Sequence, residues 1–218
     1  MARLTQPNRS QFTDPDDLEA YDAVVERQAS LKHAAEIDPA LDAPALGGYW
    51  GGLLTSPTMC AIAARMGAFM RTAGDRESSF SHADREFVDQ VLSADWKTNV
   101  VQGLHVRDAI ATGVRMEALE ALRFGHEEDL DEHERLLARY IRQVINGTVD
   151  DATFDSLASH FGKRGLLEYT GFVLWLQWII RMMQVIGVND PDDAEIDELI
   201  EGLKQGSVPV PDFRERIG

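Results

Sequence analysis

Apolar residues recur at three- and four-residue intervals along most of the chain, and no stretch alternates between apolar and polar residues as a half-buried strand does. This pattern predicts an all-α protein. Stretches rich in Gly, Pro or acidic residues separate the apolar stripes and are expected to be loops. Outside the central part of the chain, helices are predicted at about residues 15–37, 58–72, 115–124, 131–146, 153–161, 163–186 and 191–205.

Two helices joined by a short turn are predicted in the central part of the chain. Ser81 and Asp84 have the spacing of a capping box at the start of the first helix. Asp95 is expected to cap the second helix, over residues 96–112, and Gly113 is well placed to end it. These signals predict an antiparallel helical hairpin.

The hairpin carries two candidate catalytic residues, Glu86 on its first helix and His105 on its second. His105 shares a helix face with Val101 and Ala109, so it lies in a mostly apolar stripe. Glu86 and His105 are about equally far from the predicted turn, so the hairpin can bring the two side chains together. A purely structural interpretation is also open, because a core histidine can simply be hydrogen-bonded and the helix dipole favours an early glutamate.

The spacing of these residues resembles a known family. Glu86 is followed, after 18 residues, by the segment His-Val-Arg-Asp-Ala-Ile-Ala-Thr-Gly that runs from His105 to Gly113. This arrangement resembles the carboxymuconolactone decarboxylase family, which includes the alkylhydroperoxidase AhpD-like proteins, and the likeness covers about residues 45–188. The resemblance implies an AhpD-like helical bundle built around helical hairpins, a Glu and a His that line one pocket, and assembly as a homotrimer or homohexamer.

The resemblance also implies a cofactor-independent lyase of the decarboxylase type that acts on a small carboxylated or lactone metabolite. The thiol peroxidase branch of the family has cysteines seven and four residues before the histidine, where this chain has Thr98 and Val101. Thiol chemistry needs a sulfur nucleophile and a resolving partner, so a peroxidase of that type is excluded. Cys60 lies among apolar residues of a predicted helix and is expected to be buried and inert.

The candidate pair Glu86 and His105 suits proton transfer at carbon. An imidazole can take or give a proton near neutral pH, and a carboxylate beside it fixes its tautomer and stabilises its charged form. Decarboxylation, double-bond isomerisation, lactone opening and retro-aldol cleavage all fit such a pair. A binding protein that keeps the fold without the chemistry is the alternative. The predicted substrate contacts are Asn99, Gln102, Tyr49, Trp50 and Arg181, with Arg65, Arg71 and Arg107 as rival partners for a substrate carboxylate.

Three of these contacts have structural alternatives. Tyr49 and Trp50 fall in a Gly-rich segment, residues 38–52, that is expected to be a loop. They can form the lip of a pocket or anchor the loop to the core. Arg181 lies in a polar stripe of an apolar helix, and a paired structural arginine or a subunit interface explains it equally well.

The charge of the chain narrows the choice of partners. Among 218 residues, 37 are acidic and 21 are basic, which gives a formal net charge of −16. Such a surface repels nucleic acid and anionic membranes, so neither is expected as a partner. The single cysteine cannot form an internal disulfide and fits a reducing cytoplasm, and the first residues show no apolar signal segment.

No metal or cofactor is expected from the sequence. His126 and His133 lie near carboxylates, but their spacing matches no compact set of metal ligands. The predicted organisation is an N-terminal helical extension over residues 1–44, the decarboxylase-like domain over 45–188, and a C-terminal helix and tail over 189–218.

Overall fold

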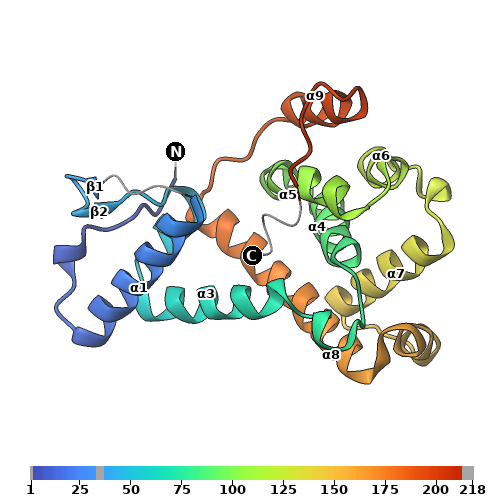
Figure 1. The fold of residues 1–218 in the computed structure, drawn as a ribbon, viewed down its shortest axis with the longest axis horizontal. Helices are drawn as coiled ribbons and strands as arrows, with labels where there is room; N and C mark the ends of the chain where they lie inside the picture. The colour runs from blue at the N-terminus through green and yellow to red at the C-terminus, as the bar shows by residue number, and fades with distance from the viewer. Residues whose placement is uncertain (1, 33–36, 213–218) are drawn as a thin grey trace. The chain divides into compact units, whose positions relative to one another are not determined.

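The computed structural model describes residues 2–32 and 37–212 (Figure 1). Within them the regular secondary structure is almost entirely helical, which confirms the predicted all-α class. The exception is a short antiparallel pair, β1 (Ile37–Asp38) with β2 (Ala43–Pro44). None of the helices in the described part of the chain is long and apolar enough to cross a membrane.

The chain groups into two compact units. The first contains the described residues up to Arg71 together with Arg181–Asn189. The second contains Thr72–Ile180 and the described residues from Asp190 onward. The borders between the units lie after Arg71, Ile180 and Asn189, and the domain division predicted at residues 44 and 188 stays a prediction.

The first unit is built on two packed helices, α1 and α3. Asp14 accepts a hydrogen bond from the backbone N–H of Asp16, so α1 begins at the predicted Asp-Pro cap. Its predicted extension to residue 37 lies partly outside the described residues, and Ile37 belongs to β1. The helices of this unit are α1 (Pro15–Lys32), α2 (Gly48–Leu53) and α3 (Pro57–Arg71), with a short 3-10 turn at Arg9–Gln11.

The second unit contains the predicted hairpin and the helices around it. Its elements are α4 (His82–Trp96), α5 (Asn99–Thr112), α6 (Met116–Phe124), α7 (Glu132–Asn146), α9 (Asp193–Lys204) and most of α8 (Asp151–Ile186), with 3-10 turns at Asp75–Glu77 and Glu127–Asp129. Helix α8 is interrupted at Gly162, whose φ of 68° and ψ of 163° are not helical. The break falls between the two helices predicted there.

The caps of the hairpin are mostly those predicted. Ser81 and Asp84 form the reciprocal capping box of α4, and Gly113, with a φ of 106°, ends α5. The prediction for Asp95 is wrong. Asp95 lies inside α4, where it pairs with Arg142 at 2.8 Å, and α5 begins after Thr98 instead. The second helix therefore starts three residues, a little under one helical turn, later in the chain than expected.

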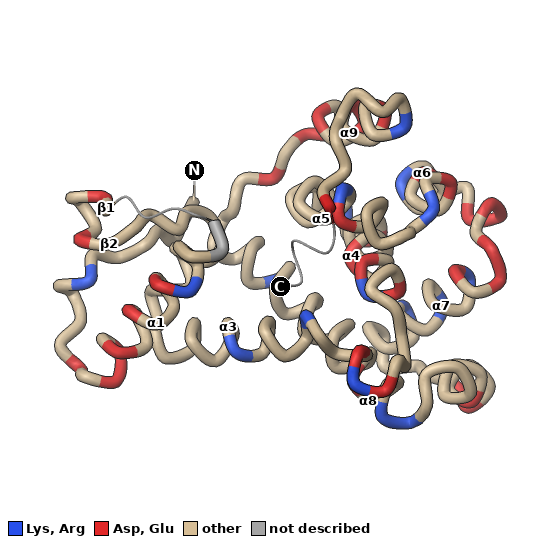
Figure 2. The backbone as a smooth tube through the Cα atoms, viewed as in Figure 1, with Lys and Arg blue, Asp and Glu red and all other residues tan. Residues whose placement is uncertain are grey.

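Acidic side chains are concentrated at a few places in the second unit. They gather between α6 and α7 and along α9 (Figure 2). Several of them stabilise helix starts, because Asp131 and Asp192 accept hydrogen bonds from backbone N–H groups at the starts of α7 and α9. Much of the negative charge is therefore explained by capping and by solvent exposure.

Candidate acid–base site

Glu86 and His105 are in direct contact in the second unit. Helices α4 and α5 pack along each other as a hairpin (Figure 1). The Nδ1 atom of His105 lies 3.1 Å from Oε2 of Glu86. A carboxylate can only accept, so Nδ1–H is the donor, and this fixes the tautomer of the neutral ring.

The two side chains differ in exposure. The Glu86 side chain is only 5% exposed, whereas 38% of the His105 side chain is exposed. The remaining oxygen of Glu86, Oε1, accepts a hydrogen bond of 2.7 Å from the guanidinium of Arg85. Glu86 is therefore held on both oxygens, and His105 keeps an accessible edge that a substrate can approach.

A second carboxylate faces the other ring nitrogen of His105. Oδ1 of Asp89 lies 3.8 Å from Nε2, and the Asp89 side chain is 2% exposed. Asp89 comes one turn after Glu86 on α4, so both carboxylates lie on the face that meets α5. The imidazole is thus placed between two buried carboxyl groups.

This arrangement changes the pKa of all three groups. Burial acts to lower the pKa of His105, but the charge of Asp89 and the hydrogen bond and charge of Glu86 outweigh it and raise the pKa to about 9. Burial acts to raise the pKa of Glu86, yet its contacts with His105 and Arg85 hold the pKa below its usual value. Burial raises the pKa of Asp89 to about 7. At neutral pH the site therefore favours an imidazolium.

The same three residues are the group within the described chain that could hold a metal ion. Glu86, Asp89 and His105 each offer a donor atom, and these atoms lie within 4.8 Å of one another. Both oxygens of Glu86 are, however, engaged by Arg85 and His105. Oδ1 of Asp89 and Nε2 of His105 have no such partner, but a metal ion on Nε2 would have to displace the proton that the imidazolium carries at neutral pH. The arrangement fits proton exchange better than it fits a cation.

Several buried polar atoms on the same two helices have no hydrogen-bond partner. Within the described residues they include Oδ1 of Asp89, both side-chain amide atoms of Gln90, the hydroxyl of Ser93 and Nε2 of Gln102. Each unmade buried hydrogen bond costs about 1–3 kcal/mol, so five together would match the whole stability of a typical domain. Ordered water or a polar ligand is the physical means of satisfying them.

Asn99 and Gln102, both predicted to contact substrate, belong to a structural network. Arg123 donates to Oδ1 of Asn99 at 2.6 Å and to Oε1 of Gln102 at 3.0 Å. The amide of Asn99 donates to the carbonyl of Pro191 at 3.0 Å and to Asp193 at 2.9 Å. A substrate contact by Asn99 would require breaking these bonds, whereas Nε2 of Gln102 has no partner.

The other three predicted contacts, Tyr49, Trp50 and Arg181, belong to the first unit and not to the unit that carries the pair. The loop prediction for Tyr49 and Trp50 is wrong, since both lie in α2, where their rings meet edge to face at 5.0 Å. Helix α2 forms against α8 because Gly52 leaves room: a Cβ there would lie 2.4 Å from a methyl group of Ile186. Arg181 is exposed and donates to Gln184 at 2.9 Å.

The rival arginines and Cys60 also lie outside this cluster. Arg107 donates to the carbonyl of Pro209, and Arg65 and Arg71 lie on α3 in the first unit. Cys60 is fully buried, and burial raises the pKa of its thiol to about 12, as expected of an inert thiol.

A hollow of about 520 Å³ lies in the first unit. It contains the ion pair of Arg9 with Asp22 but none of the residues of the cluster. Its lining includes the carboxylates of Asp22, Glu26 and Asp42, but no histidine or cysteine. The hollow therefore shows no pair comparable to Glu86 and His105.

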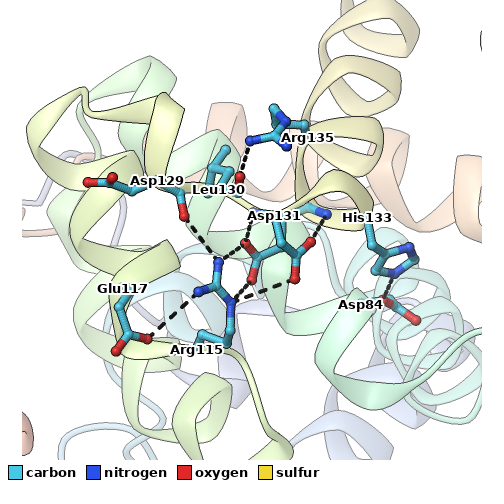
Figure 3. Close-up of polar contacts among 9 residues, drawn as sticks. Asp84, Arg115, Glu117, Asp129, Leu130, Asp131, His133 and Arg135 are labelled. Atoms are coloured by element: carbon cyan, nitrogen blue, oxygen red, sulfur yellow. Dashed lines mark hydrogen bonds and ion pairs between the residues drawn. The ribbon is translucent and has the colours of Figure 1, made fainter.

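The surface histidines have ordinary structural partners. His133 is hydrogen-bonded to Oδ1 of Asp84 at 2.7 Å. The pair lies near the start of α7, where Arg115 pairs with Asp131 and Glu134 (Figure 3). The hydrogen bond to Asp84 raises the pKa of His133. This second His–Asp pair resembles the candidate site in chemistry and is somewhat more exposed, with 45% of the His133 side chain and 13% of the Asp84 side chain accessible, which makes it a natural experimental control.

The chain matches no family model, no curated protein and no solved structure. Membership of the carboxymuconolactone decarboxylase family therefore stays a prediction from the residues of the hairpin. What the structure adds is the contact between Glu86 and His105 and two residues that the sequence did not single out, Arg85 and Asp89. A signal for Asp89 exists, because it interrupts the apolar run of α4 one turn after Glu86.

Proposed function

We propose that the second unit is a cofactor-independent lyase of the decarboxylase type, with His105 as the proton donor and Glu86 as the group that orients it. The observation that carries the proposal is the hydrogen bond from Nδ1 of a partly exposed His105 to a buried Glu86. It leaves Nε2 as the nitrogen that can exchange a proton with a bound molecule.

The electrostatics favour an acid over a base. Because the flanking carboxylates raise the pKa of His105 to about 9, the ring carries a proton on each nitrogen at neutral pH. A general acid is the group that a decarboxylation needs at its second stage. Isomerisation and retro-aldol cleavage begin with removal of a proton, which an imidazolium cannot perform. Decarboxylation therefore fits the protonated ring better than isomerisation or retro-aldol cleavage does.

The proposed reaction balances without a cofactor. The bond between the substrate's α-carbon and its carboxylate breaks, carbon dioxide leaves, and the electron pair enters an enolate. Nε2–H of His105 then protonates the α-carbon, and solvent restores the proton on Nε2. Glu86 holds the ring in place through Nδ1–H and stabilises its positive charge.

The test is a substrate screen that measures whether solvent hydrogen is incorporated at the α-carbon of the product. The protein is incubated in deuterated water, with a chelator present, with a panel of β-keto acids and carboxylated lactones. Carbon NMR is used to follow carbon dioxide release and deuterium on the α-carbon. A turned-over substrate should gain one deuterium, and His105→Gln should slow the reaction by roughly 100-fold or more, the usual worth of a general acid.

The matched control is His133→Gln, which removes the imidazole of the exposed His–Asp pair on the same unit. It should keep full activity. A folded His105→Gln protein with unchanged turnover would exclude His105 as the acid. Activity that disappears with the chelator would point to a metal-dependent reaction instead.

A non-catalytic binding protein is the second candidate, and the unpartnered atoms of Gln90, Ser93 and Gln102 favour it. These groups can hold a polar molecule whether or not His105 acts on it. Under this alternative a ligand from the panel would shift the melting temperature and be recovered unchanged by mass spectrometry. Recovery of a lighter product would support the lyase.

Assembly into a homotrimer or homohexamer, and residence in a reducing cytoplasm, are part of the same proposal. Exposed apolar side chains on α3 support self-association: Met59, Ile62 and Met66 are 39%, 62% and 43% exposed. The fully buried, unoxidised thiol of Cys60 is compatible with a reducing compartment.

A further inference from the structure

Asp89 is the feature of the cluster that the pairing of Glu86 with His105 does not explain. Its side chain is 2% exposed, and Oδ1 has no hydrogen-bond partner within the described residues. A buried carboxylate needs a proton or a cation close by. Nε2 of His105, at 3.8 Å, is within reach of that oxygen.

We propose that Asp89 is a positioning residue that keeps a proton on Nε2 of His105, so that the resting site holds an imidazolium with a carboxylate facing each ring nitrogen. The two distances assign different roles to Glu86 and Asp89. Glu86, at 3.1 Å, fixes Nδ1–H and the orientation of the ring. Asp89, at 3.8 Å, is too far for a direct hydrogen bond, so it stabilises the charge without locking the second proton.

That separation has a consequence for the proposed reaction, on which this part of the inference rests. A proton that is attracted but not bonded can leave Nε2 for a carbon atom of a bound enolate, with the electron pair of the enolate forming the new C–H bond. Solvent then returns a proton to Nε2. Asp89 acts through His105 throughout and does not need to touch the substrate.

Other charges around the imidazole act in both directions. Asp108, one turn after His105 on α5, adds to the negative potential that favours the imidazolium. Arg85 on α4 donates a hydrogen bond to Oε1 of Glu86, the oxygen that does not contact His105. Its positive charge favours the ionised forms of Glu86 and Asp89. Asp89 is the charge that faces Nε2. Its removal should therefore lower the proton affinity of that nitrogen in particular.

The experiment is an NMR titration of the full chain that needs no substrate. Side-chain ¹⁵N and ¹³C signals of His105 are followed with pH in the wild type, in Asp89→Asn and in Ser93→Ala. Ser93 is the control because it lies one turn further along α4 and its hydroxyl is also buried and unpartnered. In Asp89→Asn the proton affinity of His105 should fall about tenfold or more, while the Nδ1 signal still reports the bond to Glu86. Ser93→Ala should leave the affinity unchanged.

A second measurement uses the wild type alone and covers the case in which Asp89→Asn does not fold. The carboxyl ¹³C signal of Asp89 should respond to the titration of His105, as a second step beside the protonation of Asp89 itself. An Asp89 signal that does not respond to that titration, or an unchanged His105 titration in a folded Asp89→Asn protein, would overturn the inference. If Glu86→Gln still shifts His105 in that case, the proposed pair stands without Asp89; if neither variant shifts it, both proposals fail.

Discussion

Glu86→Gln gives the most direct test of the candidate site, because it removes the charge beside His105 at nearly unchanged side-chain size, although its single oxygen cannot also accept the hydrogen bond from Arg85. The amide oxygen of glutamine can still accept the hydrogen bond from Nδ1–H, so the ring should keep its place. Unit charges about 4 Å apart attract by about 4 kcal/mol in a protein environment of intermediate polarity, and each pKa unit corresponds to about 1.36 kcal/mol. Loss of the Glu86 charge can therefore lower the pKa of His105 by at most about three units.

The exposure of His105 and the presence of Asp89 both make the expected fall in the pKa of His105 smaller than this upper bound. Because 38% of the His105 side chain is exposed, solvent screens part of the attraction. Asp89 still faces Nε2 in the variant and continues to favour the imidazolium. We therefore expect the pKa of His105 to fall from about 9 by roughly one to two units, toward its ordinary value, in Glu86→Gln.

The assay is the imidazole NMR signal of His105 between about pH 5 and pH 10, recorded for the wild type and Glu86→Gln. His133 provides an internal reference in the same spectra, since its partner is Asp84 and not Glu86. Its titration should not move. A His105 pKa that stays constant while the fold is intact would refute the coupling. Equal shifts at both histidines would indicate a general change in the protein.

Three further outcomes can be measured without a substrate. The folded pKa of His105, about 9, lies above its ordinary value of 6.5, so its stabilising contribution is complete below about pH 6.5 and is lost as the pH rises through 9; the free energy of unfolding in urea should fall over that range, and His105→Gln should flatten the fall. Gly162 and Gly147 have nearly equal φ, 68° and 67°, but ψ of 163° and 32°, and open space at the Cβ position. Asparagine tolerates only the second conformation, so Gly162→Asn should cost about 1–3 kcal/mol in urea unfolding and Gly147→Asn well under half as much. Light scattering at micromolar concentration should show an oligomer that Ile62→Glu weakens, and a monomeric wild type would contradict self-association.

The contact between Glu86 and His105 could be predicted because it depends on local signals. Helical spacing and the caps at Ser81 and Gly113 were enough to place both residues on facing sides of a hairpin. The error at Asp95 moved the start of the second helix by three residues, or about 4.5 Å along a helix. Long side chains such as those of Glu and His bridge that distance, so the contact survived the error.

The structural role of Asn99 could not be predicted, because it depends on partners far away in the chain. Arg123, Pro191 and Asp193 come together with it only when α6 and α9 pack beside α5. The same limit applies to Tyr49, whose Gly-rich surroundings have the composition of a loop. The close approach of Ile186 to Gly52 shows that Gly52 is required for packing within a helix. Composition alone cannot separate these two uses of glycine.

The importance of Asp89 became visible only through burial. A chain with 37 acidic residues offers many candidates for a catalytic carboxylate, and sequence patterns rank them poorly. In the described residues just three acidic side chains are buried: Glu86, Asp89 and Glu134. Glu134 is explained by its pairing with Arg115 and its place in the cap of α7, and Glu86 is held by Arg85 and His105. Asp89 alone keeps an oxygen without a hydrogen bond, and that oxygen faces the imidazole. This placement of a buried carboxylate oxygen 3.8 Å from Nε2 is the argument that Asp89 acts on His105.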